Sequence, residues 1–347
     1  MNNYTSQTKK YYIWIDYAKF ISIFLVTSFH VPFRVEGYWG DALTNLRLPL
    51  FFFLSGFLFN PTKYHKFSSF FKHRFRQLLV PYFSFFLLFY PLWIFIGKNM
   101  GNEADLDASY IKPLIECLYG RPTLVCAPLW FISCLFCLQC IYFFICKAIK
   151  KTWILITILI LISLFIYVPI TYSKAPWGFE KACRYIVFYG IASCFKSEIL
   201  KIVSHSYRIV LSFMMLLVFL LGVYIKSQTT NVYLEHSLFV ICGLLVIYPI
   251  AVFSDILSNK LGDIRWVKYI TANAIVVLAL ENYVIGTLKI LFFDIIGVNE
   301  TSFTGMYCIN IAFSFIVLAL ITIPIYIINR YFPFIIGKDN LRREPRN

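Results

Sequence analysis

Apolar residues recur along the whole chain in runs of about twenty, a length that lets an α-helix cross the hydrocarbon core of a bilayer. Shorter polar stretches separate the runs. The pattern predicts an all-α integral membrane protein, a single domain over residues 1–347 made of about ten transmembrane helices with short tails at 1–12 and 330–347. The expected spans are residues 13–33, 43–60, 78–97, 124–146, 152–171, 179–196, 208–226, 233–254, 269–293 and 305–329.

The composition agrees with this pattern. Hydrophobic residues make up 60% of the 347 residues and charged residues only 14%, whereas a soluble domain carries about a quarter charged residues. The first apolar run is not typical of a cleaved signal peptide, because Asp16 and Lys19 interrupt it and no small-residue cleavage site follows.

The net charge of +15 is unevenly distributed. With a cytoplasmic N-terminus, most of the 32 Lys and Arg residues fall in the segments expected on the inner side, as the positive-inside rule requires. An even number of spans then places both termini in the cytoplasm. We therefore interpret the basic charge as a sign of topology and of contact with anionic lipid, and we expect no nucleic-acid partner.

The first span carries three ionisable residues, Asp16, Lys19 and His30. On a helix Lys19 and His30 lie within about 20° of the same face and about 16 Å apart along the axis, while Asp16 can pair with Lys19 one turn away. An ionisable residue inside a span is a functional candidate, and an imidazole is suited to taking a proton from a hydroxyl. The alternative is a snorkelling Asp–Lys pair and a histidine that only packs.

The ten cysteines lie mostly inside the expected spans. Cys134, Cys137 and Cys140 recur every three residues, but no His or acidic residue stands near them to complete a tetrahedral metal site, so we interpret them as packing residues. Cys117 and Cys126, in or near an outer segment, could form a disulfide in an oxidising compartment.

Several sequence blocks resemble one family in its usual order. Asp16-Tyr-Ala-Lys19, ten further residues and His30 resemble the opening of the membrane acyltransferase-3 family, although Lys19 and Phe20 stand where Arg and Gly are common. "RLPLFFFLSG" from Arg47 is similar to the "RMPLFFFLSG" block of the fucose 4-O-acetylase-like branch. The blocks "KHRFRQLLVPY", "PLWFISCLF" and "NAIVVLALENYVIGTLK" resemble later family segments.

The resemblance implies a bundle of ten or so helices that transfers an acyl group, commonly acetyl from cytoplasmic acetyl-CoA, to a sugar hydroxyl. By this resemblance His30 is the catalytic residue, as base or acyl relay. Lys19 replaces an essential arginine and lacks its bidentate fork. In the basic inner loop, Arg74 and Arg76 are expected to contact the phosphates of the donor, although ordinary positive-inside charge explains them equally well.

Four further positions follow from the same blocks. Arg47, near the outer end of its span, is expected to orient the sugar or polarise the thioester, or else to serve as an interfacial anchor. Ser55 and Gly56 are expected to let helices approach closely. Glu281 stands before Asn282 where the branch usually has His, and a carboxylate buried there could orient His30, change the acceptor or abolish a step.

We therefore expect a membrane-embedded O-acetyltransferase of the bacterial cytoplasmic membrane that modifies a surface polysaccharide or glycolipid, with no metal or redox cofactor. A glycolipid transporter or flippase and a catalytically silent relative are the alternatives. The sequence does not predict the oligomeric state. The residues assigned to substrate or donor binding are Asp16, Lys19, Arg47, Arg74, Arg76 and Asn282, beside the catalytic pair His30 and Glu281.

Overall fold

The apolar runs of the sequence form helices throughout the computed structural model, which describes residues 11–33, 35–98, 109–297 and 306–338. Within these ranges the chain is helical with no β-strand. Most of the two tails lies outside the described residues.

The first half of the described chain contains ten α-helical and 3-10 elements and three π-helical turns that continue a preceding helix. They are α1 (Ile13–His30), α2 (Gly37–Phe57), η1 (Pro61–Lys63), α3 (Phe67–Arg74), η2 (Phe75–Leu79), α4 (Val80–Leu92), η3 (Trp93–Gly97), α7 (Lys112–Leu118), α8 (Thr123–Cys126), η4 (Ala127–Leu129), α9 (Trp130–Ala148), α10 (Thr152–Leu161) and η5 (Ile162–Tyr167). The second half contains η6 (Pro176–Gly178), α11 (Phe179–Cys194), α12 (Lys196–Val203), α13 (Arg208–Gln228), α14 (Val232–Leu261), α15 (Arg265–Ala272), α16 (Ala274–Lys289), η7 (Ile290–Ile295), α17 (Tyr307–Tyr331) and η9 (Pro333–Ile336).

Six helices of the described chain are long and apolar enough to cross a membrane, so the chain is a multi-pass membrane protein. They are Phe67–Gly97, Thr123–Ala148, Arg208–Gln228, Val232–Leu261, Ala274–Ile295 and Tyr307–Tyr331. The other expected spans also form helices, but α1 and α2 carry charged residues and the helices at 152–167 and 179–194 are short. The count of ten spans and the cytoplasmic position of both termini therefore stay predictions.

The third helix begins earlier than the sequence indicated. We expected a basic inner loop before residue 78, whereas α3 starts at Phe67 and continues through η2 into α4. Phe70 stacks on Phe143 of α9, with ring centroids 4.5 Å apart, so α3 buries an aromatic face against a neighbouring helix. Arg74 and Arg76 consequently lie on a helix rather than in a loop.

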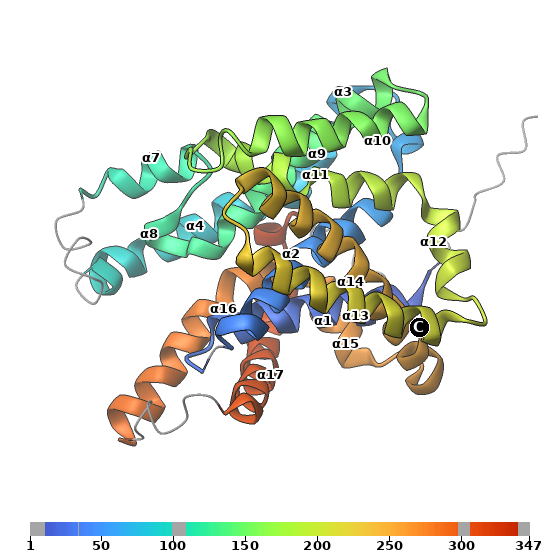
Figure 1. Cartoon of the computed structure of the whole chain (residues 1–347). Helices are drawn as coiled ribbons and strands as arrows, with labels where there is room; N and C mark the ends of the chain where they lie inside the picture. The colour runs from blue at the N-terminus through green and yellow to red at the C-terminus, as the bar shows by residue number, and fades with distance from the viewer. Residues whose placement is uncertain (1–10, 34, 99–108, 298–305, 339–347) are drawn as a thin grey trace, which may run out of the picture.

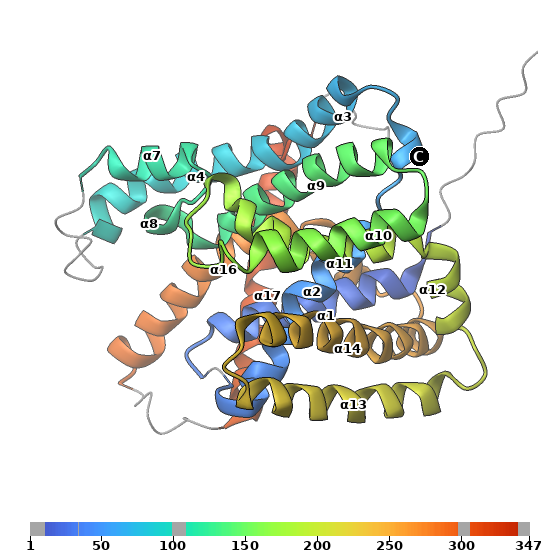
Figure 2. The same cartoon turned by 45° about the horizontal axis from the view of Figure 1, so that its top comes forward.

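Helix α2 occupies the middle of the molecule and packs against α1, α11 and α14 (Figure 1). In Figure 2 α9, α10, α13 and α14 run in roughly the same direction, with α1 and α2 among them. The contact of α2 with α11 depends on Gly56, because a Cβ there would lie 2.0 Å from the carbonyl oxygen of Tyr189. The structure thus shows the close helix approach expected at Gly56.

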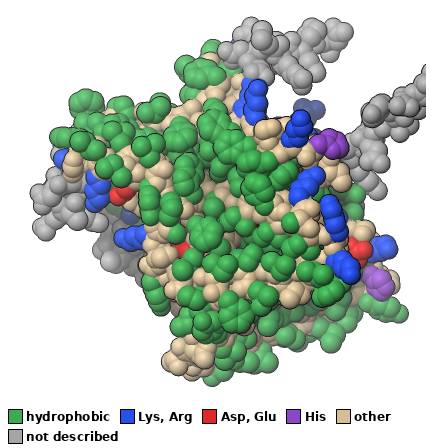
Figure 3. All heavy atoms as spheres, turned by 90° about the horizontal axis from the view of Figure 1, so that it is seen from above, with side chains coloured by type: hydrophobic (Ala, Val, Ile, Leu, Met, Phe, Trp, Pro, Cys, Tyr) green, Lys and Arg blue, Asp and Glu red, His purple; other side chains and the backbone are tan. Residues whose placement is uncertain are grey.

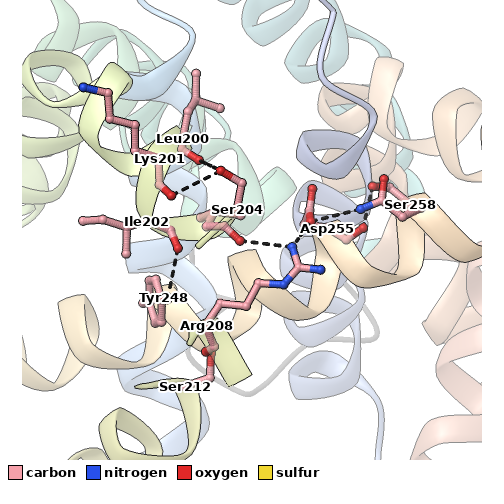
Figure 4. Close-up of polar contacts among 11 residues, drawn as sticks. Leu200, Lys201, Ile202, Ser204, Arg208, Ser212, Tyr248, Asp255 and Ser258 are labelled. Atoms are coloured by element: carbon pink, nitrogen blue, oxygen red, sulfur yellow. Dashed lines mark hydrogen bonds and ion pairs between the residues drawn. The ribbon is translucent and has the colours of Figure 1, made fainter. Parts of the chain in front are cut away.

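Hydrophobic side chains cover most of the face seen in Figure 3, as expected of a surface that contacts lipid. Lys and Arg side chains gather on that face at the end where α12 lies in Figure 1. At this end Arg208 at the start of α13 forms an ion pair with Asp255 of α14, with Nη1 and Oδ2 2.6 Å apart, and also donates to the carbonyl of Val203 (Figure 4). The turn between α12 and α13 is thereby fixed to α14.

All ten cysteines are free thiols in the structure. Cys117 and Cys126 are both buried, and the possible disulfide between them is not formed. Burial in α7 raises the pKa of the Cys117 thiol to about 11, so this thiol is a poor nucleophile at neutral pH.

Candidate active site

The first helix ends at His30 for a local reason. Pro32 disfavours the helical conformation at the residue before it, and Val31 is extended, with φ −69° and ψ 154°. Asn310 of α17 donates from Nδ2 to the carbonyl oxygens of Ser28 and Phe33, at 2.8 and 2.9 Å. These bonds fix the end of α1 and the turn after it, and so fix the position of the imidazole.

His30 contacts a carboxylate across the bundle. Its Nδ1 lies 2.7 Å from Oε1 of Glu281, which α16 carries. The Glu281 side chain is fully buried, and its second oxygen, Oε2, accepts a hydrogen bond from the Thr27 hydroxyl at 3.1 Å. Thr27 and His30 stand one turn apart on α1, so one helix holds both oxygens of the carboxylate.

The arrangement determines what the imidazole can do. A carboxylate at Nδ1 favours a proton on that nitrogen and leaves the lone pair on Nε2. Among the described residues Nε2 of His30 has no hydrogen-bond partner, and the side chain is 28% exposed. The free nitrogen can accept a proton from a hydroxyl, and the carboxylate stabilises the imidazolium that results.

Arg47 lies beside the same end of α1. Its guanidinium stacks 3.7 Å from the ring centroid of Phe29, the residue before His30, and Nη2 donates to the hydroxyl of Thr44 at 2.9 Å. Ser22 of α1 donates to the backbone carbonyl of Arg47 at 2.7 Å, which joins the two helices. The structure therefore brings Arg47 and His30 into one neighbourhood.

The other two ionisable residues of the first span lie nearer the N-terminal end of α1. Asp16 accepts a hydrogen bond from the hydroxyl of Tyr11. Lys19 is partly buried. Its spacing of eleven residues from His30 places both residues on about the same face of the helix. The Asp16–Lys19 pair stays a prediction, as does a role for either residue in substrate binding.

Buried polar atoms occur on the three helices that carry Arg74, Tyr189 and Gln139. Nη1 of Arg74 donates to the side-chain oxygen of Gln77 at 2.9 Å, but its Nε is buried with no partner among the described residues. Tyr189 of α11, close enough for Arg74 to act on it electrostatically, has a buried hydroxyl without a partner. The side-chain oxygen of Gln139 is also buried with no hydrogen-bond partner among the described residues.

Gln139 faces the helix that carries Arg74. It shares a face of α9 with Phe136 and Phe143, whose rings pack against Phe71 and Phe70 of α3. Buried polar atoms without partners need an explanation, and a polar ligand is one. Arg76 is engaged differently, because its Nε donates to the carbonyl of Gly337 at 2.8 Å and so fixes the segment after α17.

Sequence reasoning alone did not single out Thr27, Asn310, Gln139 or Tyr189. Each is an uncharged residue whose role depends on a partner from a distant helix. The one signal in the sequence is that Asn310 and Gln139 are amide residues within otherwise apolar runs, where polar side chains are unusual. Asn282, assigned to substrate binding, is partly exposed beside Glu281, and no hydrogen bond of its side chain is present among the described residues.

A family model described as an acyltransferase domain, that of acyltransferase-3, matches residues 12–330. The chain belongs to the acyltransferase-3 family. This match covers α1 through nearly all of α17 and supports a membrane-type acyltransferase. No curated protein and no solved structure gives a significant match to the chain.

Proposed function

We propose that this acyltransferase-3 protein is an O-acetyltransferase that moves acetyl from acetyl-CoA to a hydroxyl of a sugar in a surface polysaccharide or glycolipid. The observation that carries the proposal is the contact of 2.7 Å between Nδ1 of His30 and the fully buried carboxylate of Glu281. A carboxylate that orients an imidazole is the arrangement that acyl transfer by general base catalysis requires.

In the proposed reaction Nε2 of His30 takes the proton of the acceptor hydroxyl as its oxygen attacks the thioester carbonyl. The carbon–sulfur bond then breaks, and the imidazolium returns the proton to the departing thiolate of coenzyme A. Glu281 keeps the imidazole in one tautomer and stabilises its charged form. Only the carboxylate side of the pair is fully buried, so we propose that the bound substrates cover the exposed side of His30 and exclude water from the thioester.

The donor is proposed to enter from the cytoplasmic side, at Arg74. Its guanidinium is suited to a phosphate oxygen. The unpartnered Tyr189 hydroxyl and Gln139 oxygen can bind the amide groups of the pantetheine arm. Lys19, on α1 toward its N-terminal end, is proposed to supply a positive charge along the route of the donor.

The location is part of the same proposal. The apolar belt and the concentration of Lys and Arg at one end support a protein of the bacterial cytoplasmic membrane with that end inside. The block around Arg47 supports the fucose 4-O-acetylase-like branch, although Glu281 departs from its usual histidine.

The test uses purified protein in liposomes with labelled acetyl-CoA and a panel of sugar and glycolipid acceptors. Label should reach a glycan with the native protein and not with His30→Gln. The matched control is His205→Gln, because His205 is exposed in the turn between α12 and α13. If the native protein and His30→Gln both leave the label on coenzyme A, the proposal fails and a transporter or silent relative replaces it.

A further inference from the structure

Four side chains form a patch near His30 that combines two cations with two aromatic rings. We define this outer cationic patch as Arg47 and Phe51 of α2, Trp130 of α9 and Lys181 of α11. The Lys181 ammonium lies 3.7 Å from the ring centroid of Trp130. Phe51, one turn after Arg47, contacts Phe131 beside Trp130, with ring centroids 4.8 Å apart. All four patch residues are partly exposed.

The patch adjoins the proposed catalytic centre from two sides. Arg47 stacks on Phe29, whose ring centroid is 5.5 Å from that of His30. On the other side, Trp130 directly follows η4, and η4 packs against α16, the helix of Glu281. The thiol of Cys126, at the end of α8, reaches the carbonyl of Ala279 at 3.4 Å in the same contact. A molecule bound at the Arg47 end of the patch therefore lies close to His30.

The patch carries an excess of positive charge. Among the described residues no carboxylate forms an ion pair with Arg47 or Lys181. Glu180, the residue before Lys181, attracts its charge but forms its ion pair with Arg121. Arg184, one turn after Lys181, adds a further cation, which lies 4.1 Å from the ring centroid of Phe239.

Cations held in a partly buried site without a counter-charge are costly, so their retention points to an anionic ligand. An arginine fork binds a carboxylate or phosphate through two hydrogen bonds, and a lysine adds a mobile point charge. The rings of Phe51 and Trp130 offer apolar surface against which the ring of a sugar can pack.

We infer that the acceptor is an acidic glycan, one whose sugar carries a carboxylate or a phosphate, and that Arg47 and Lys181 bind the acid group while a hydroxyl faces His30. The inference rests on the proposed function and names its acceptor class. A uronic-type carboxylate and a sugar phosphate share the required charge.

Binding is measured separately from turnover, so that the inferred acidic acceptor and the proposed acetyl transfer are tested independently. His30→Ala protein in detergent is titrated with matched oligosaccharides that are neutral, carry a carboxylate or carry a phosphate. We expect the acidic ligands to bind at least about tenfold more tightly than the neutral one, and added salt to weaken their binding. Whichever acidic ligand binds more tightly identifies the source of the charge.

Variants of Lys181 then test the patch itself. Lys181→Gln should weaken binding of the acidic ligand by about 10- to 100-fold, the loss expected for one charged hydrogen bond. Lys181→Arg should retain the preference, which also shows that this position tolerates substitution. Lys174→Gln, at an exposed lysine of the preceding loop, is the control and should bind as the parent protein does.

Equal binding of acidic and neutral ligands, or binding unaffected by Lys181→Gln, overturns the inference even if acetyl transfer to a neutral sugar is found. Preferential binding of the acidic ligand that Lys181→Gln abolishes supports the patch even if no transfer is detected. In that case only the proposed catalysis fails.

Discussion

At the scale of single residues, the site depends on how a buried carboxylate is satisfied. The Glu281 side chain is fully buried, and both of its oxygens have hydrogen-bond partners on α1, namely His30 and Thr27. A buried charge without such partners would destabilise the fold. The sequence allowed an orienting role for Glu281 toward His30 but could not exclude a changed acceptor or a lost step. Thr27 was unpredictable because a threonine in an apolar helix usually bonds its own backbone.

The Thr27 hydroxyl can be tested with a substitution of nearly the same shape. Thr27→Val leaves Oε2 of the buried carboxylate without a partner, which costs about 1–3 kcal/mol. We expect acetyl transfer to fall about tenfold and the Tm in detergent to drop. Thr287→Val is the control, since this exposed α16 hydroxyl only bonds the Tyr283 carbonyl of its own helix. Equal effects of the two substitutions would contradict the role of Thr27.

At the scale of helices, apolar runs and charge positions were enough to place every expected span on a helix, but not to set all the boundaries. The start of the third helix moved to Phe67 because Phe70 and Phe71 pack on α9. The ninth was expected to start at residue 269, but α15 ends at Ala272 and Asn273 separates it from α16. Such contacts between distant helices leave no periodic signal in the local sequence.

The close approach of α2 and α11 gives a prediction about stability. Gly56→Ala places a methyl group against the Tyr189 carbonyl, so the helices must separate, and we expect a loss of at least about 1–3 kcal/mol. Gly286→Ala in α16 adds a methyl group with no atom within 4 Å and improves helix propensity. Thermal unfolding should show a lower Tm for Gly56→Ala and an unchanged or higher Tm for Gly286→Ala. The reverse order would refute the packing argument.

At the scale of the whole molecule, the sequence predicted an all-helical, multi-pass membrane protein, and this is confirmed. The number of spans stays a prediction. Helices α1 and α2 bury polar residues inside the bundle and are therefore less apolar than helices that face lipid. A hydropathy threshold identifies helices that face lipid but misses helices in the interior of a bundle. Side-specific labelling can therefore determine the topology better than any pattern.

Two exposed tyrosines at opposite ends serve as labelling sites. Tyr172, 90% exposed, precedes α11, and Tyr207, 71% exposed, precedes α13. In a Cys308→Ser background, which removes the exposed native thiol, an impermeant maleimide should label Tyr172→Cys in intact cells. It should label Tyr207→Cys only after permeabilisation. Labelling of position 207 in intact cells would invert the proposed orientation.

The central claim is that His30 and Glu281 act as one catalytic unit, and a double-mutant cycle of the acetyl-transfer rate tests it most directly. His30→Ala should lower the rate by about 10²- to 10⁴-fold, and Glu281→Gln by a large part of that factor. The double variant should be no slower than His30→Ala alone, because the carboxylate acts only through the imidazole. Losses that multiply in the double variant, or full activity of His30→Ala, would contradict the account.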